Sequence, residues 1–188
     1  SKRVLITGGN KGIGLAVSRA MLEFGYEVII VARDFDTCPL VGVANVTAIE
    51  YDLSDVDGLL VLAKEVGEID ILINNAGYMQ PKYSYDNYPK EAKEQIMNVD
   101  LYTPIELMNI FSVGMKKRKY GRIVNTASIA GQIGHPDVWY GIAKAGLINA
   151  TKIYGKLLGK DGITVNCVAP SPTETDMQKD NSEERKAE

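Results

Sequence analysis

Tyr140 and Lys144 lie four residues apart in the helix-compatible segment Trp139–Gly146. Residues at positions i and i+4 share one face of a helix, so the phenol and the ammonium can reach the same ligand. A free phenol is a weak acid, with a pKa of about 10, and a neighbouring cation favours its ionised form. The pair could therefore exchange a proton with a bound substrate. The same spacing also arises by chance on helix surfaces, so the rest of the sequence must decide between the two interpretations.

A glycine-rich turn stands between the first apolar run and the first amphipathic segment. Its glycines follow the spacing G-x-x-x-G-x-G. Glycine permits a tight turn and lets the backbone approach a pyrophosphate, while N–H groups at the start of the next helix face the phosphate oxygens. The sequence therefore predicts a dinucleotide-binding turn formed by Gly8, Asn10, Lys11, Gly12, Ile13 and Gly14.

The end of the second apolar run indicates which nicotinamide nucleotide the turn would hold. An acidic residue at this place usually binds the ribose of NAD. Here the position is Ala32, followed by Arg33, whose guanidinium can pair with a phosphate, and Lys11 could reach the same group. These cations predict NADP, with NAD as the alternative. Asp34 could neutralise Arg33, and two solvated surface cations remain the other interpretation.

The elements that must position these residues alternate along the chain. Short apolar runs predict strands over residues 4–7, 28–31, 46–51, 69–73, 122–126 and 163–168. Periodicity and capping residues predict helices over 13–24, 54–66, 89–117 and 138–159, with Ser54 as an N-cap and Pro104 inside the third helix. Residues 34–45 show no helical period. This alternation predicts an α/β fold with a doubly wound, Rossmann-like parallel sheet. We expect one domain over residues 1–177 and a polar tail over 178–188.

Composition excludes several classes of function. The 188 residues carry a net charge of −3, which argues against a nucleic-acid partner. No apolar run approaches the roughly 18 residues that span a membrane. Cys38 and Cys167 stand in unrelated contexts and predict neither a metal site nor a disulfide. The chain enters a strand directly after Ser1-Lys2-Arg3, without room for a signal peptide, so we expect a cytoplasmic protein.

Over residues 3 to about 177 the chain resembles the short-chain dehydrogenase/reductase family in its single-domain form. Residues 121–146 most resemble the 3-oxoacyl-carrier-protein reductase and the sugar or alcohol dehydrogenase branches, and the chain as a whole resembles 3-oxoacyl-carrier-protein reductase-like members. The motifs that carry the resemblance are Thr7-Gly8-x-x-x-Gly12-Ile13-Gly14, Asp52-Leu53, Asn74-Asn75-Ala76-Gly77, Asn98-Val99-Asp100, Ser128, the Tyr140/Lys144 pair and Val165-Asn166-x-Val168-x-Pro170.

The resemblance implies four catalytic residues. Tyr140 would be the acid or base, and Lys144 would favour the phenolate and bond the nicotinamide ribose. Ser128 would hold the substrate oxygen, and Asn98 would anchor a water that relays protons to Lys144. The further cofactor contacts that it implies are Asp52 and Leu53 at the adenine, Asn75, Ala76 and Gly77 at the ribose, and Pro170, Thr173 and Thr175 at the nicotinamide amide.

Some features depart from the family pattern. The helix between the second and third strands is missing, Ser171 replaces a glycine, and a seventh strand expected from the family is not seen. His135 matches no family role and is interpreted as a loop residue. Trp139 and the tyrosines at 78, 83, 85 and 88 are expected to wall the substrate cleft or pack the loop.

The predicted function is an NADP(H)-dependent oxidoreductase that acts on a small-molecule carbonyl or alcohol. The resemblance also implies a homo-oligomer, a dimer or tetramer, formed through the two long helices. Two alternatives stay open at this point. One is a catalytically silent NADP(H)-binding regulatory or scaffold protein. The other, nucleotide-sugar epimerisation, requires a larger carboxyl-terminal domain than 188 residues leave.

Overall fold

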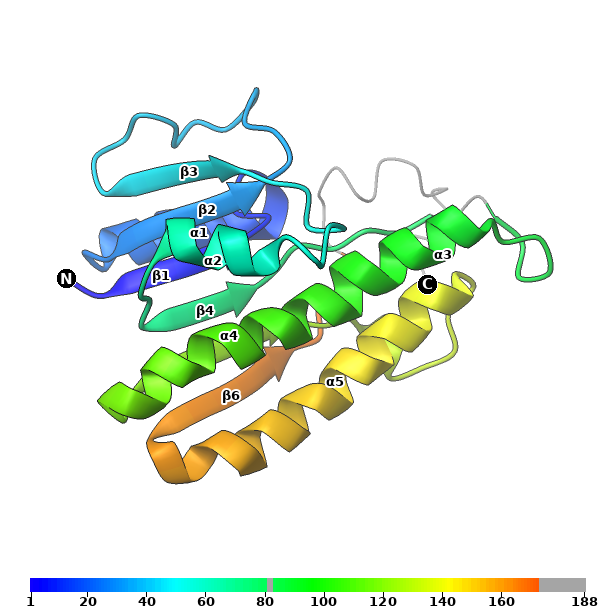
Figure 1. Ribbon diagram of the computed structural model, residues 1–188. Coiled ribbons are helices and arrows are strands. Elements are labelled where there is room, and N and C mark those ends of the chain that lie inside the picture. The colour runs from blue at the N-terminus through cyan, green and yellow to red at the C-terminus, as the bar shows by residue number, and fades with distance from the viewer. Residues whose placement is uncertain (81–82, 173–188) are drawn as a thin grey trace.

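The computed structural model describes residues 1–80 and 83–172 and places six parallel strands in one sheet (Figure 1). The strands are β1 (Arg3–Thr7), β2 (Glu27–Ala32), β3 (Val46–Glu50), β4 (Ile71–Asn74), β5 (Gly121–Thr126) and β6 (Ile163–Val168). Their order across the sheet is β3-β2-β1-β4-β5-β6. All six predicted strands are present, and the doubly wound, Rossmann-like fold is confirmed. The direction of winding reverses between β1 and β4, where sheets of this kind open a ligand crevice.

Helices cover the two faces of the sheet unequally. They are α1 (Gly12–Glu23), α2 (Leu59–Val66), α3 (Lys90–Met97), α4 (Thr103–Arg118) and α5 (Val138–Leu158). Side chains alternate along β1, so Leu5 packs with residues of α2, α4 and α5, while Val4 and Ile6 pack with α1. Both core layers are almost free of solvent contact, which explains why the central strands read as continuous apolar runs.

The start of α2 differs from the prediction. Ser54 does not cap it, and the helix begins only at Leu59, after Gly58. The Asp52 carboxylate accepts the Ser54 N–H at 2.9 Å, and the Asp55 carboxylate accepts the Gly58 N–H at 3.1 Å. Such local bonds from aspartate offer the backbone an alternative to the helix. Residues 52–58 therefore form turns. As predicted, residues 34–45 contain no helix.

The long helix expected over residues 89–117 is interrupted in its middle. A π-helical segment, η1 (Asn98–Tyr102), joins α3 to α4, and Pro104 follows in the first turn of α4. Proline has no N–H to donate to the carbonyl four residues before it, and its ring would collide with that carbonyl. The wider π turn relieves this conflict at Asp100. It also changes which side chains of this segment face α5.

The described helices include none that is both long and apolar enough to cross a membrane.

Candidate active site

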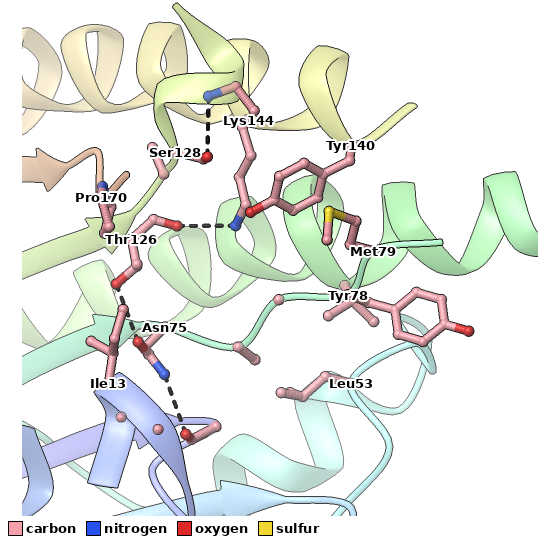
Figure 2. Close-up of a pocket in the computed structure, with 18 of the residues that line it drawn as sticks. Ile13, Leu53, Asn75, Tyr78, Met79, Thr126, Ser128, Tyr140, Lys144 and Pro170 are labelled. Atoms are coloured by element: carbon pink, nitrogen blue, oxygen red, sulfur yellow. Dashed lines mark hydrogen bonds between the residues drawn. The ribbon is translucent and has the colours of Figure 1, made fainter. Parts of the chain in front are cut away.

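A cleft of about 750 Å³ opens where the carboxyl ends of β1, β2, β4 and β5 meet (Figure 2). The sequence-predicted site residues that line it are Gly8, Asn10, Lys11, Gly12, Ile13, Gly14, Arg33, Asp52, Leu53, Asn75, Ala76, Gly77, Ser128, Tyr140, Lys144 and Pro170. The structure therefore brings together residues from nearly the whole described chain. Thr173 and Thr175, which are also predicted contacts, lie outside the described residues.

The glycine turn forms one end of the cleft and leaves little room for a side chain. Gly8 and Gly12 have φ angles of 64° and 53°, in the left-handed region that favours glycine. A Cβ added to Gly14 would overlap the Gly8 carbonyl oxygen. Lys11 precedes α1 without a side-chain cap, so N–H groups of the first turn are open to an acceptor. The turn fits the pyrophosphate of a dinucleotide.

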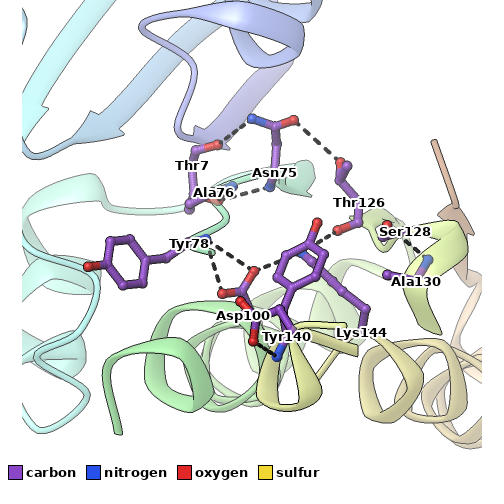
Figure 3. A network of polar contacts seen from close by, with 11 residues as sticks. Thr7, Asn75, Ala76, Tyr78, Asp100, Thr126, Ser128, Ala130, Tyr140 and Lys144 are labelled. Atoms are coloured by element: carbon purple, nitrogen blue, oxygen red, sulfur yellow. Dashed lines mark hydrogen bonds and ion pairs between the residues drawn. The ribbon is translucent and has the colours of Figure 1, made fainter. Parts of the chain in front are cut away.

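Three side chains fix this turn and the strands beside it. The Asn75 amide donates to the Thr7 and Gly8 carbonyls, each at 3.2 Å, and the Thr7 hydroxyl accepts the N–H groups of Asn75 and Ala76 (Figure 3). The Asn10 amide donates to the Asp34 carbonyl at 2.9 Å. Asn75 thus ties β4 to β1, and Asn10 ties the turn to the end of β2. These bonds hold the turn before any ligand arrives.

Two cations flank the nucleotide end of the cleft. Arg33 and Lys11 are both exposed and both line it. The Arg33 guanidinium carbon lies 5.9 Å from the centroid of the Tyr78 ring. Within residues 1–80 and 83–172, Arg33 forms no salt bridge with Asp34. The guanidinium can therefore receive an anionic group from the cleft.

The opposite end of the cleft gathers Tyr140, Lys144 and Ser128 (Figure 2). Tyr140 and Lys144 lie one helical turn apart on α5, and the Lys144 ammonium is 5.5 Å from the centroid of the Tyr140 ring. This ammonium donates to the Thr126 carbonyl at 3.0 Å. Ser128 follows β5, and its hydroxyl accepts the Ala130 N–H at 3.1 Å. The phenol, the ammonium and the hydroxyl thus line the same end of the cleft.

Burial controls the ionisation of this group. It raises the pKa of Tyr140 above its usual value, and the Asp100 and Asp137 carboxylates raise that pKa further, against the opposing effects of Lys144 and of hydrogen bonding to Ser128. Burial alone would lower the pKa of Lys144, but the carboxylate of Asp100 and the phenol of Tyr140 outweigh it and raise that pKa. Tyr140 is thus protonated and Lys144 charged at neutral pH. The phenol is in the form that donates a proton.

Asn98 does not lie where the resemblance places it. Its amide donates to the Ser54 carbonyl at 2.9 Å, and it lines a separate depression beside α4. Asp100 instead faces the site, with a carboxylate oxygen 3.0 Å from the Lys144 ammonium. The π turn explains the difference, because an additional residue in that turn shifts the direction of the side chains within it. The sequence signal for Asp100 is a single acid between Val99 and Leu101, within a segment that has to pack against α5.

Asp137 is a second residue that the sequence analysis missed. It is the N-cap of α5, and its carboxylate accepts the Tyr140 N–H at 3.2 Å. The same carboxylate accepts the Gln80 N–H and the Tyr88 hydroxyl, each at 2.9 Å. An aspartate one residue before a predicted helix is the typical signal of such a cap. Asp137 therefore joins α5 to the loop that follows β4.

The remaining wall of the cleft is largely aromatic and apolar. His135 lies in the loop before α5, as predicted, with its ring centroid 5.6 Å from that of Tyr140. Its Nδ1 atom accepts the Asp137 N–H at 3.1 Å, so the ring is held at the cleft wall. Tyr78, Met79 and Ile133 line the same region. This surface suits a neutral organic substrate next to the phenol.

Comparisons with known proteins identify the family to which this fold belongs. The model of the short chain dehydrogenase family matches residues 2–186. The chain is 35% identical over 205 residues to the 3-oxoacyl-[acyl-carrier-protein] reductase of Vibrio cholerae, covering 99% of this chain and 80% of that protein. It superimposes on 4-hydroxyisoleucine dehydrogenase complexed with NADH with a TM-score of 0.87, at 27% identity and with 97% and 82% of the two chains covered. The chain also superimposes on the RhlG/NADP complex of Pseudomonas aeruginosa with a TM-score of 0.84, at 29% identity, covering 95% of this chain and 75% of that one.

Proposed function

The chain belongs to the short-chain dehydrogenase family and is a nicotinamide-dependent oxidoreductase, and we propose that it transfers hydride between NADP(H) and a carbonyl or secondary alcohol, with Tyr140 as acid or base. One observation carries the proposal. Tyr140, Lys144 and Ser128 meet at one end of a continuous cleft whose other end is the glycine turn. A ligand that spans the cleft therefore places its two ends against a phosphate site and a proton donor.

Each polar group has a distinct part in the proposed reduction. The bound nicotinamide supplies the hydride, which the substrate carbon accepts. Ser128 donates a hydrogen bond to the substrate oxygen and orients it toward Tyr140. The phenol transfers its proton to that oxygen as negative charge develops there. Lys144 compensates the phenolate charge that remains. In the direction of alcohol oxidation, Tyr140 accepts the proton instead.

The proposed preference for NADP(H) rests on charge at the end of β2. Solved structures similar to this chain include one complex with NADH and one with NADP, so family membership leaves both nucleotides open. In this chain Ala32 offers no carboxylate to a ribose hydroxyl, whereas Arg33 and Lys11 face the same end of the cleft. Two cations favour a ligand that carries an additional phosphate.

We also propose the remaining features that the resemblance implies. The substrate is a small-molecule carbonyl or alcohol, and the first compounds to test are 3-oxoacyl thioesters, since the Vibrio cholerae relative is a 3-oxoacyl-[acyl-carrier-protein] reductase. Cys38 and Cys167 are both free thiols, which suits the proposed cytoplasmic location. The protein is proposed to act as a homo-oligomer.

The proposal is tested by the loss of NADPH absorbance with a panel of 3-oxoacyl thioesters, ketones and aldehydes. We expect turnover by the unaltered protein and a fall in kcat of about 10²–10⁴-fold for Tyr140→Phe, because the proton donor is removed. The affinity for NADPH, measured by fluorescence titration, should change little. Tyr154→Phe alters a tyrosine further along α5 that bonds Asn109, and it serves as the matched control with unchanged turnover.

Two outcomes would contradict the proposal. Near-normal turnover by Tyr140→Phe would remove Tyr140 from the chemistry. NADPH binding without turnover of any compound in the panel would instead support the catalytically silent alternative.

A further inference from the structure

Asp100 is a buried carboxylate next to the proposed catalytic pair (Figure 3). It is 0% exposed, and one of its oxygens lies 3.0 Å from the Lys144 ammonium. The Tyr78 backbone N–H donates to both of its oxygens, at 3.3 and 3.0 Å. A charge buried this deeply is costly unless it is paired and hydrogen-bonded, and Asp100 meets both conditions. The ammonium and the backbone N–H therefore both stabilise the ionised form of the Asp100 carboxyl group.

The π segment and its neighbours hold Asp100 in this position. Asp100 lies in the middle of η1, and Thr103 anchors the end of that segment by donating its hydroxyl to the Leu53 carbonyl at 2.7 Å. Asn98 anchors the start through the Ser54 carbonyl. Both anchors reach the segment that leads into α2. The backbone that carries Asp100 is thus fixed on each side by a side-chain hydrogen bond to a carbonyl of residues 53–54.

We propose that Asp100 is a positioning residue of this site, which holds the Lys144 ammonium between Tyr140 and the Thr126 carbonyl and offsets its charge. The inference rests on the proposed function, because it concerns the proton that Tyr140 transfers. Lys144 alone would attract the phenolate strongly. With Asp100 present, the positive charge of the ammonium is already balanced by the carboxylate before Tyr140 ionises.

The groups that face the phenol come from several elements. Tyr140 and Lys144 belong to α5, Asp137 caps that helix, Asp100 belongs to η1, and Ser128 follows β5. When Tyr140 is protonated, Asp100 and Lys144 cancel each other, and Asp137 contributes a further negative charge. Formation of a phenolate adds another negative charge to this group.

The direction of the effect follows from these charges. Burial raises the pKa of Asp100 to about 6, against the lowering effect of Lys144, so the carboxylate is ionised at pH 7 and above. The ionised carboxylate raises the pKa of Tyr140, in the same direction as burial. Asp100 thus keeps Tyr140 protonated to higher pH than Lys144 alone would. A site of this kind favours carbonyl reduction near neutral pH and needs alkaline pH for alcohol oxidation.

Asp100→Asn is the direct test, since it keeps the shape and the acceptor for the Tyr78 N–H but removes the charge. We expect the midpoint of the pH profile for alcohol oxidation, measured as kcat/KM, to move to lower pH. A midpoint lower by one pH unit gives about tenfold more phenolate at any pH well below it. Asp161→Asn removes the same charge from an ion pair with Lys119 beyond the far end of α5, and its profile should match that of the unaltered protein.

A second measurement needs no substrate. The alkaline absorbance of tyrosinate, taken as the difference between each protein and its Tyr140→Phe derivative, reports the ionisation of Tyr140 alone. We expect this ionisation at lower pH in Asp100→Asn, and likewise in Asp100→Ser. If the unaltered protein turned over no compound, the proposed function would fail while this titration still tested Asp100.

Coincident profiles for Asp100→Asn and the unaltered protein, or a shift to higher pH, would overturn the inference. Failure of both Asp100 variants to fold in the presence of NADPH would also overturn it, because it would assign Asp100 to the stability of the core.

Discussion

At the scale of single residues, charge rather than shape distinguishes the two ends of the cleft. Arg33 and Lys11 present exposed cations at the glycine turn, where water and salt screen them. Lys144 and Asp100 form a buried pair at the other end, where an unpaired charge would be costly. Substitutions at the first end should therefore change ligand preference. Substitutions at the second should change the pH range of the chemistry.

Arg33→Ala should weaken NADPH more than NADH. Loss of a charge-assisted hydrogen bond costs about 1.5–3 kcal/mol, so we expect a rise of roughly 10–150-fold in the Kd of NADPH. The Kd of NADH should change little, since it has no 2′-phosphate to pair with the guanidinium. Fluorescence titrations with both nucleotides measure the difference. Arg19→Ala removes an exposed cation from α1 and is the control. Equal weakening of both nucleotides by Arg33→Ala would show that Arg33 does not contact the 2′-phosphate.

At the scale of elements, α5 carries the proposed chemistry and depends on its first turn. Tyr140 lies three residues after the cap, Asp137, so the hydrogen bond that caps the helix also fixes the backbone of the proposed acid or base. The Asp137 carboxylate also accepts hydrogen bonds from the Gln80 N–H and the Tyr88 hydroxyl, which belong to the loop after β4. One buried carboxylate thus couples α5 to the loop after β4, whose residues Tyr78 and Met79 line the cleft.

Asp137→Ala should destabilise the protein markedly. It removes the N-cap of α5 and leaves the N–H of Gln80 and the hydroxyl of Tyr88 without their acceptor, so we expect the free energy of unfolding to fall by about 2–4 kcal/mol. Asp137→Asn keeps a capping oxygen and should lose distinctly less. Urea unfolding followed by circular dichroism gives both values. A loss below about 0.5 kcal/mol for Asp137→Ala, the range of ordinary surface substitutions, would contradict this role.

At the scale of the whole molecule, α4 and α5 lie side by side on one face of the sheet (Figure 1). Both helices bury one side against the core and leave large apolar side chains on the other. Val113 on α4 is 55% exposed, and Ile153 and Leu157 on α5 are 47% and 58% exposed. These residues agree with the homo-oligomer that the family resemblance implies, because oligomer interfaces have apolar centres.

The protein should therefore elute as a dimer or tetramer when its mass is measured by light scattering during size-exclusion chromatography. The double variant Ile153→Lys/Leu157→Lys should give a smaller species with an unchanged circular dichroism spectrum, since buried charges oppose association. Leu60→Lys/Val61→Lys makes the same exchange at exposed positions of α2 and should leave the mass unchanged. A monomeric unaltered protein across the concentration range would refute the expectation.

Local patterns in the sequence were sufficient for much of this structure. Strands buried on both faces must be apolar throughout, so the short runs that include Val4–Ile6 and Val28–Val31 predicted the sheet. Glycine at positions 8, 12 and 14 predicted the turn, because Gly8 and Gly12 adopt left-handed φ angles and a side chain at Gly14 would overlap the Gly8 carbonyl. The i and i+4 spacing placed Tyr140 and Lys144 on one face of α5. All of these features depend on neighbours within one helical turn or one strand.

Only the tertiary structure decided which distant side chains meet. The π segment η1, which ends at Tyr102, places Asp100 against Lys144 and Asn98 against the Ser54 carbonyl, and the sequence spacing alone does not show which of the two side chains reaches the site. Hydrogen bonds from backbone N–H groups to the Asp52 and Asp55 carboxylates likewise form turns, so α2 begins later in the chain than the sequence predicted. Sequence periodicity records the backbone repeat of each element, but the partners of a buried charge depend on how separate elements pack. The sequence by itself therefore determined the sheet, the glycine turn and the Tyr/Lys pair, whereas packing of η1 against α5 determined the charge beside them.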